Sequence, residues 1–220
     1  PFVIWKTASS LDGKVASRDG TSRWITGEAA RRDVHRLRAW SDAILVGAGT
    51  VVADDPSLTV RDPEYTGRPP LRVLADAAGR VPPSGDLFDD EAPTIVATTE
   101  RAGRDRREAW RAAGAEVLVY APGSDGMVPV GELLRDLGKR DVQGVLLEGG
   151  PTLAWSAVEE GAVDRVVAYL APALIGGAEA PSALGGRGFA PVGRALRLDL
   201  VEAETVGGDL RVEADVHRDR

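Results

Sequence analysis

The sequence predicts an α/β fold in which helices flank a mostly parallel central sheet and the chain ends in an antiparallel hairpin. Apolar runs of strand length recur along the chain, and helical patterns lie between them. Most of the early runs are continuous rather than alternating, which is typical of strands covered on both faces, as in parallel sheets. Alternation of such strands with helices indicates an α/β architecture. The last two runs instead flank Gly207-Gly208, a dipeptide that favours a tight hairpin turn.

The apolar runs define the expected strands, and the periodic segments define the expected helices. We expect strands over residues 2–5, 43–46, 71–74, 94–97, 116–119, 144–147, 163–170, 196–201 and 210–216. Helical patterns cover residues of about 28–40, 105–113, 130–139 and 152–160. Segments 62–70, 81–92 and 176–193 are rich in Pro and Gly, so we expect loops there.

Length and composition predict one domain over residues 1–220, either alone or as the C-terminal part of a longer chain. The net charge of −7 argues against nucleic acid as a main partner, because a phosphate backbone requires a basic surface. The chain has no cysteine, which excludes disulfides and thiolate catalysis. Its two histidines, His35 and His217, are far apart in sequence, so we expect no metal site. The sequence has neither a run of membrane-spanning length nor a secretory pattern, so we expect a cytoplasmic protein without a membrane partner.

The stretch Glu148-Gly149-Gly150-Pro151-Thr152 follows the apolar run 145–147 directly and is the strongest candidate for a binding site. Two adjacent glycines allow backbone N–H groups to approach a ligand closely, and Pro151 suits the first position of a helix. A helix N-terminus attracts phosphate, and ligands bind at the carboxyl ends of strands in open α/β sheets. The alternative interpretation is an ordinary tight turn between a strand and a helix.

A second glycine turn, Gly47-Ala48-Gly49-Thr50, follows the expected strand at 43–46 and makes a nucleotide site more credible. Neither turn has the G-x-G-x-x-G spacing of a Rossmann fold or the G-K-[ST] of a P-loop. Asp54-Asp55-Pro56 then indicates a turn or a helix cap.

The helix expected at 28–40 carries its apolar stripe on Ala30, Val34 and Leu37. Arg31 and Arg38 lie on the shoulder of that stripe, where an arginine either reaches into a cleft or remains solvated with its stem packed down. We expect His35 to lie farther toward solvent.

A set of motifs in a fixed order carries a resemblance to a known family. They are KTASSLDGK at 6–14, GTSRWITG at 20–27, RRDVHRLR at 31–38, DAILVG at 42–47, TVVADDPSLTVR at 50–61, EGGPTL at 148–153, GAVD at 161–164 and YLAP at 169–172. In this order and spacing the chain resembles the reductase domain of the bifunctional deaminase–reductase of riboflavin biosynthesis. The resemblance covers essentially the whole chain.

The resemblance implies a dihydrofolate-reductase-like fold and a specific reaction. Members of this family reduce 5-amino-6-(5-phosphoribosylamino)uracil to the ribitylamino compound with NADPH. Relatives that lack the deaminase take the substrate that still bears the 2-amino group, so the preferred pyrimidine stays open. The zinc-deaminase signatures His-x-Glu and Cys-x-x-Cys are missing from this sequence. The resemblance also implies a homodimer, with the strand at 163–170 and the loop at 176–193 as candidate interface, and a fused or separate deaminase as partner.

The resemblance further implies roles for individual residues. Ser22, Arg38, Leu58, Arg61 and Glu148 match substrate contacts of the family. The matches to cofactor contacts are Ala8, Trp24, Thr50, Asp54, Ala77 and Gly149, Gly150, Pro151, Thr152, Leu153, Ala154, Trp155 and Ser156. A cis peptide between Gly149 and Gly150 is also implied.

The chemistry of these residue types agrees with the implied roles. Arg38 and Arg61 offer planar, bidentate donors to a phosphate, and Ser22 adds a hydroxyl. Lys6, Asp54 and Glu148 are the candidate catalytic residues, with Lys6 or Asp54 handling the proton and Glu148 holding the pyrimidine or the ribose. Arg101 is the candidate ligand for the 2′-phosphate of NADPH. Two alternatives stay open, a dihydrofolate-type reductase with another substrate and a nucleotide-binding module without catalysis.

Overall fold

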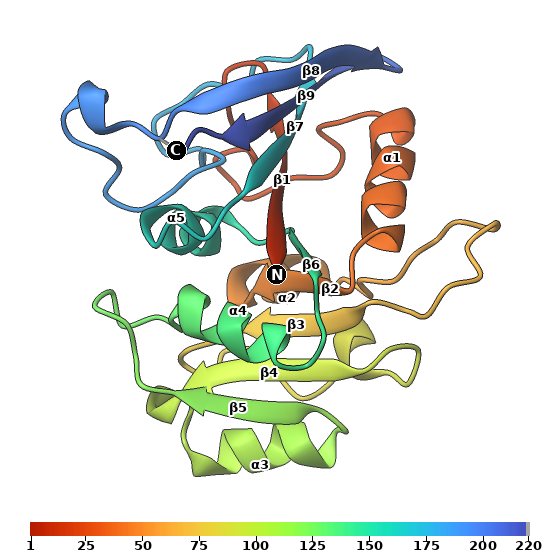
Figure 1. Ribbon diagram of the computed structural model, residues 1–220, viewed down its shortest axis with the longest axis vertical. Helices are drawn as coiled ribbons and strands as arrows, with labels where there is room; N and C mark the ends of the chain where they lie inside the picture. Colours follow the sequence, from red (N-terminus) through yellow and green to blue (C-terminus); the bar gives the residue numbers. More distant parts are fainter. Residues whose placement is uncertain (219–220) are drawn as a thin grey trace.

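The computed structural model describes residues 1–218 and contains one nine-stranded sheet with the order β5-β4-β3-β2-β6-β1-β7-β9-β8. Figure 1 shows this sheet running from β5 at the bottom of the view to β8 at the top. The strands are β1 (Phe2–Ser10), β2 (Ala43–Gly47), β3 (Leu71–Ala75), β4 (Thr94–Thr99), β5 (Glu116–Tyr120), β6 (Gly144–Leu147), β7 (Arg165–Ala171), β8 (Leu198–Val206) and β9 (Asp209–Val216).

All neighbouring strands from β5 to β7 are parallel, and only the pairs β7–β9 and β9–β8 are antiparallel. The predicted fold class is therefore confirmed. Gly207 and Gly208 join β8 to β9, and Gly207 adopts a φ of 64°, which glycine tolerates without a steric penalty.

The helices cover both faces of the sheet. They are α1 (Glu28–Ala39), α2 (Ala48–Asp54), α3 (Arg104–Ala112), α4 (Val130–Gly138) and α5 (Pro151–Glu159), with short 3₁₀ turns at Asp86–Phe88, Glu100–Ala102 and Val192–Arg194. One face of the sheet packs against α4 and α5, and the opposite face packs against α1, α2 and α3.

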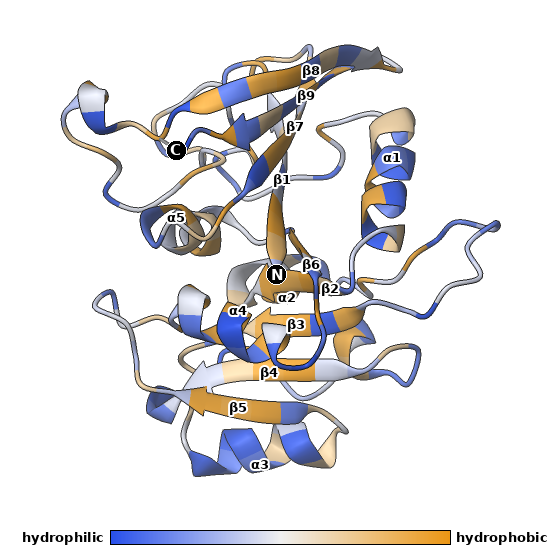
Figure 2. Cartoon of the chain, in the orientation of Figure 1, coloured by the Kyte–Doolittle hydropathy of each residue, from blue (hydrophilic) through white to orange (hydrophobic). Residues whose placement is uncertain are grey.

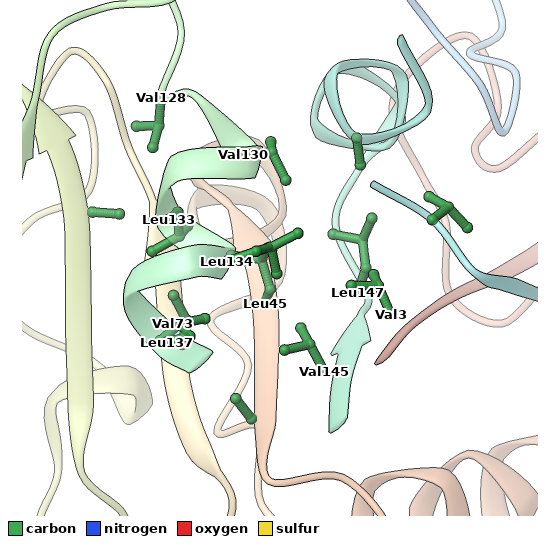
Figure 3. Packing of buried hydrophobic residues seen from close by; sticks show 14 of the residues in the cluster. Val3, Leu45, Val73, Val128, Val130, Leu133, Leu134, Leu137, Val145 and Leu147 are labelled. Atoms are coloured by element: carbon green, nitrogen blue, oxygen red, sulfur yellow. The ribbon is translucent and has the colours of Figure 1, made fainter. Parts of the chain in front are cut away.

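Alternate residues of the buried strands supply the two cores. Leu45 and Val73 pack against Leu133, Leu134 and other residues of α4 on one face (Figure 3). Ile44 and Leu74 belong to the core on the other face. Full burial of a side chain of this size stabilises the fold by roughly 1.5–3 kcal/mol. Figure 2 shows apolar central strands and a largely hydrophilic α3. Each central strand is thus buried on both sides, as the continuous apolar runs predicted.

One element differs from the expectations. Helix α2 was not predicted, because its sequence AGTVVAD contains Gly, Thr and two Val, which all have modest helix propensity. Asp55 closes that helix with a φ of 41°, in keeping with the expected cap. Strand β7, expected at a dimer interface, lies inside the sheet between β1 and β9 and offers no free edge.

The expected cis peptide between Gly149 and Gly150 is wrong. Among the described residues, the cis bonds are Arg23–Trp24 and Ala190–Pro191. Gly150 takes an ordinary extended conformation, with φ −67° and ψ 177°, as the N-cap of α5. A trans bond therefore suffices to lead the chain into the helix, and trans is the lower-energy form outside X–Pro bonds. In residues 1–218 we find no helix both long and apolar enough for a membrane span.

Candidate active site

A cleft of about 1170 Å³ opens beside β1 and beyond the carboxyl ends of β2, β3 and β6. The chain continues there into α2, α5 and the loop after β3. The cleft is larger than the roughly 300–1,000 Å³ of a pocket for one drug-sized molecule, so there is room for two ligands side by side. Its position outside the carboxyl ends of parallel strands is the usual ligand position in open α/β sheets.

The end of β6 creates the floor of the cleft. Leu147, the last residue of β6, pairs with Trp5 of β1, whereas β1 continues to Ser10 and pairs there only with β7. Lys6, Thr7 and Ala8 therefore face open space on the β6 side, and all three line the cleft. Glu148 follows β6 directly, and its N–H donates to the carbonyl of Leu45 at 2.9 Å. The middle of β1 and the end of β6 thus bring Lys6 and Glu148 to the same place.

Glu148 forms a two-pronged ion pair with Arg38 of α1. Nε of Arg38 donates to Oε1 at 2.6 Å and Nη2 donates to Oε2 at 3.0 Å. The side chains are only 14% and 9% exposed. Burial pushes the pKa of Glu148 upward, but the Arg38 guanidinium outweighs it and holds that pKa below the ordinary value. Glu148 is therefore an anion fixed in orientation, and Arg38 is occupied by it.

Lys6 lies beside this pair. Burial lowers the pKa of its ammonium group below the ordinary value, the Glu148 carboxylate acts in the opposite direction, and Arg38 lowers the pKa further. A lysine with a lowered pKa gives up a proton more easily than a solvated one, which suits general acid catalysis near neutral pH.

The loop at residues 57–61 forms one wall. Leu58 is buried in the core, with a φ of 51°, while Arg61 reaches the cleft and donates from Nη2 to Oγ of Ser57 at 2.8 Å. Within residues 1–218, that hydrogen bond is the only one made by the Arg61 guanidinium, and no carboxylate pairs with it. Arg61 therefore has donors available for an anion, in contrast to Arg38.

The two glycine turns meet at another wall of the cleft. Gly47 is the N-cap of α2 and Gly150 is the N-cap of α5. A Cβ on Gly47 would lie 3.4 Å from Cβ of Leu153, and a Cβ on Gly149 would lie 2.6 Å from Cδ2 of the same leucine. The turns therefore pack closely around Leu153, and two helix N-termini open into one cleft. Backbone N–H groups at the start of a helix attract anionic groups such as phosphate.

The loop after β3 completes that wall. The Asp76 carboxylate accepts hydrogen bonds from the backbone N–H groups of Ala78, Gly79 and Val81, which fixes the turn that carries Ala77. Arg101 lines the cleft next to this turn and donates to the Gly126 carbonyl at 2.8 Å.

Aromatic and charged residues surround the mouth of the cleft. The guanidinium carbon of Arg31 lies 4.4 Å from the centroid of Trp24, which is 68% exposed and offers a flat face to a ligand. Arg23 pairs with Asp54 at 3.3 Å and so ties the preceding loop to the end of α2. Asp54 is therefore engaged at the rim rather than on the floor.

The structure brings nearly all the predicted site residues together in one cleft. Those that line it are Lys6, Ala8, Ser22, Trp24, Arg38, Thr50, Asp54, Leu58, Arg61, Ala77, Glu148, Gly149, Gly150, Pro151, Thr152, Leu153 and Ser156. Two predicted residues do not line it. Ala154 belongs to the core, and Trp155 packs against Phe189 with ring centroids 5.1 Å apart. Both lie on the side of α5 that turns away from the cleft.

The cleft residues that were absent from the predicted site include Arg31, His35 and Asp76. His35, expected toward solvent, lines the cleft because the loop at 57–61 folds over α1 and its Arg61 N–H donates to Nδ1 of His35 at 3.1 Å. The RRDVHRLR motif was the available signal for His35, and the end of β3 was the signal for Asp76. In the described part of the chain, no group of acidic and histidine side chains is arranged to hold a metal ion.

A cleft at the carboxyl ends of a parallel sheet, with a buried Lys–Glu–Arg cluster on its floor, is typical of an α/β enzyme. Comparison with known proteins narrows this class. Residues 1–212 match the family model described as the RibD C-terminal domain, and the chain belongs to that family. The predicted resemblance is thus confirmed.

Individual relatives agree with the family. The chain is 41% identical over 217 residues to a 2,5-diamino-6-ribosylamino-4(3H)-pyrimidinone 5′-phosphate reductase of Methanothermobacter thermautotrophicus and covers 98% of both proteins. It is 38% identical to the riboflavin biosynthesis protein RibD of Actinobacillus pleuropneumoniae, but it spans only 56% of that relative's length.

Solved structures confirm the fold. The structure of a diaminohydroxyphosphoribosylaminopyrimidine deaminase/5-amino-6-(5-phosphoribosylamino)uracil reductase from Thermotoga maritima matches 99% of this chain and 57% of its own, with a TM-score of 0.82 and 31% identity. Dihydrofolate reductase from Enterococcus faecalis matches with a TM-score of 0.53 at 10% identity, which is a likeness of fold alone.

Proposed function

We propose that this protein is an NADPH-dependent reductase of riboflavin biosynthesis that reduces the ribosyl group of 5-amino-6-(5-phosphoribosylamino)uracil. The main support for the proposal is that two different walls meet in one cleft. The glycine-capped wall of α2 and α5 suits a dinucleotide, and the wall of Arg61, Arg38 and Glu148 suits a phosphorylated, polar substrate. Membership of the reductase family supports the same conclusion.

Phosphate recognition falls to Arg61 in this proposal. Arg38, expected as a second phosphate ligand, is engaged with Glu148. Its role is therefore to orient the Glu148 carboxylate, which in turn accepts hydrogen bonds from the ribose or the pyrimidine. Ser22 lines the same cleft and adds a hydroxyl donor. The open donors of Arg61 and the hydroxyl of Ser22 together suit a phosphorylated sugar, which a pterin without an anionic group does not offer.

We assign the glycine-capped wall of α2 and α5 to the cofactor. Backbone N–H groups at the starts of α2 and α5 hold its phosphates, and Arg101 binds the 2′-phosphate that distinguishes NADPH from NADH. When bound, the cofactor supplies the hydride. The residues of the chain orient the reacting carbon, C1′ of the ribosyl group, and exclude water.

Lys6 is the proposed proton donor. Opening of the ribose ring to an imine requires a proton on the ring oxygen, and reduction of that imine requires a proton on nitrogen. The burial of Lys6 beside Glu148 and the lowered pKa of its ammonium group support this role. Asp54, the other candidate, pairs with Arg23 at the rim.

The preferred pyrimidine is decided by a direct comparison. NADPH oxidation is followed by absorbance with 5-amino-6-(5-phosphoribosylamino)uracil and with its 2,5-diamino analogue, the compound class in the name of the Methanothermobacter relative. Turnover of either supports the reductase, and the faster one shows whether deamination precedes reduction. Tight NADPH binding without turnover of either would instead favour a binding module.

Three further features stay predictions. A homodimer is supported by the outer strand β8, where Leu198, Leu200 and Val201 are exposed. Cooperation with a deaminase is supported by the Thermotoga relative, whose name includes both activities. A cytoplasmic location, where NADPH is available, follows from the proposed reaction. Sedimentation analysis, co-purification and cell fractionation would test them in turn.

A further inference from the structure

Helix α1 holds the loop at 57–61 at two points, one turn of the helix apart. The backbone N–H of Arg61 donates to Nδ1 of His35 at 3.1 Å, and Nη1 of Arg38 donates to the carbonyl of Thr59 at 3.1 Å. Both helix residues line the cleft. A loop without regular secondary structure is thus clamped to a rigid element next to the proposed substrate site.

The His35 contact acts on Arg61 itself. Leu58 anchors the middle of the loop in the core, and Oγ of Ser57 lies 3.3 Å from Oγ1 of Thr59 and accepts from the Arg61 side chain at 2.8 Å. The Arg61 backbone is fastened to the rest of the protein by His35. His35 therefore fixes the Arg61 backbone from which the side chain extends, and Ser57 holds the guanidinium.

We propose that neutral His35 is a positioning residue that holds Arg61 toward the phosphate of the substrate, so that substrate affinity depends on the protonation of His35. The proposal rests on the proposed function, because it takes Arg61 as the ligand of a phosphorylated substrate. It adds a residue that would never touch the substrate and yet controls its binding.

Only the neutral imidazole can accept the Arg61 N–H, because both nitrogens of an imidazolium are donors. The charged groups around the ring are Arg38 on its own helix, Arg61 on the loop and Glu148 at the end of β6. Burial and the two arginines lower the pKa of His35, against opposing effects of Glu148 and the Thr59 carbonyl, and the net direction is downward from 6.5. His35 is therefore neutral at physiological pH, and the clamp is closed there.

Acidification should open the clamp. Below the lowered pKa, the protonated ring would present an N–H to the N–H of Arg61, and the Arg61 end of the loop would lose its contact with α1, while the Arg38 contact with Thr59 remains. The KM for the phosphorylated substrate would rise, while the KM for NADPH would not, because the proposed cofactor wall is built from α2, α5 and the loop after β3. The phosphate itself gains a proton near pH 6, so the effect must be separated from the titration of the substrate.

Two variants make that separation. His35→Asn places an amide oxygen near the position of Nδ1 and keeps the acceptor without a titration, whereas His35→Ala removes the acceptor. Arg32→Ala on the exposed side of the same helix is the matched control. KM and kcat for substrate and NADPH are measured for each protein from about pH 8 to about pH 5, the range in which an imidazole titrates.

We expect His35→Ala to raise the substrate KM about tenfold, the equivalent of one net hydrogen bond, with kcat and the NADPH KM within about twofold of the unaltered protein. His35→Asn should keep the low substrate KM at neutral pH. At acid pH its substrate KM should rise only as far as the protonation of the substrate phosphate requires, without the further rise caused by protonation of His35. An unchanged substrate KM in His35→Ala would overturn the proposal. A result in which His35→Asn behaves as His35→Ala, or in which kcat falls with both, would overturn it as well.

Failure of the proposed function is a separate outcome. If the unaltered protein oxidises NADPH with neither pyrimidine, the reductase assignment fails, and the clamp is tested by calorimetry with ribose 5-phosphate. Binding by the unaltered protein and by His35→Asn, with weaker binding by His35→Ala, would support the clamp on its own. Equal binding by all three proteins, or no binding by the unaltered protein, would overturn it.

Discussion

Arg38 and Glu148, which are 110 residues apart in the chain, form a buried ion pair through two nitrogens and both carboxylate oxygens. The pair joins α1 to the end of β6 and so connects the helix that carries His35 to the floor of the cleft. Its geometry makes the carboxylate a fixed anion between Lys6 and the proposed substrate position. The stability of the protein and its dependence on pH both follow from this contact.

The first prediction concerns stability. Arg38→Ala leaves the Glu148 carboxylate buried without a partner and should lower the free energy of unfolding by about 3–5 kcal/mol. Urea denaturation measures the loss, and Arg104→Ala, which breaks the exposed pair with Glu108, is the control that should leave the midpoint unchanged. The double variant Arg38→Met/Glu148→Met should recover much of the loss, since it removes both charges. A loss no larger than that of Arg104→Ala would contradict the energetic role of the pair.

The second prediction concerns pH. The folded-state pKa of Glu148 is held below its ordinary value of 4.5, so the native state binds the proton less readily than the unfolded chain. The stabilisation is complete above the unfolded pKa and is lost as the pH falls through the lower folded pKa. Urea titrations from about pH 7 to about pH 3 should therefore show a smaller acid-induced loss of stability for Glu148→Gln than for the unaltered protein. If the free energy of unfolding fell equally with pH in both proteins, the lowered pKa of folded Glu148 would be refuted.

The third prediction concerns the proton donor. Lys6→Met should reduce kcat by about a hundredfold or more, with little change in the KM for NADPH. The same change should not destabilise the protein at neutral pH, because burial disfavours the Lys6 ammonium group and removal of the charge relieves that cost. Asp54→Asn should keep turnover within about fivefold. If Asp54→Asn reduced kcat strongly and Lys6→Met did not, Asp54 would be the proton donor instead.

The fourth prediction concerns the choice of cofactor. Arg101→Ala should lower the preference for NADPH over NADH about tenfold or more, because a charge-assisted contact to the 2′-phosphate is lost. The kcat/KM for NADH should stay near its original value, which separates this effect from damage to the cleft. Arg104→Ala is again the control, since Arg104 lies outside the cleft. If Arg101→Ala left the preference for NADPH over NADH unchanged, another part of the protein would have to bind the 2′-phosphate.

Much of the fold follows from the sequence because its signals are local. Continuous apolar runs predicted the parallel strands, and Gly207-Gly208 predicted the final hairpin. Helix α2 escaped prediction because its β-branched residues and glycine contradict its conformation, and tertiary packing of Val51 into the core overrides that preference.

The site was predicted less completely because its key relationships are not local. The motifs identified Arg38, Arg61 and Glu148, but only the folded chain reveals that Arg38 is bound to Glu148 while Arg61 keeps open donors. His35 was misplaced because helical periodicity describes one helix and cannot include the loop that later covers it. Ala154 and Trp155 were included as parts of a contiguous stretch, although a helix with 3.6 residues per turn directs part of any such stretch away from a cleft.

In the proposed reaction, a hydride passes in the cleft from a nicotinamide cofactor to C1′ of a phosphoribosylaminopyrimidine. NADPH deuterated at C4 of the nicotinamide, on the side from which the hydride leaves, tests this transfer when the product is analysed by mass spectrometry. We expect a ribitylamino product that carries a single deuterium at C1′, formed in step with NADPH oxidation. Oxidation of NADPH without deuterium in that product, or an unreduced ribosyl group after prolonged incubation with either pyrimidine, would contradict it.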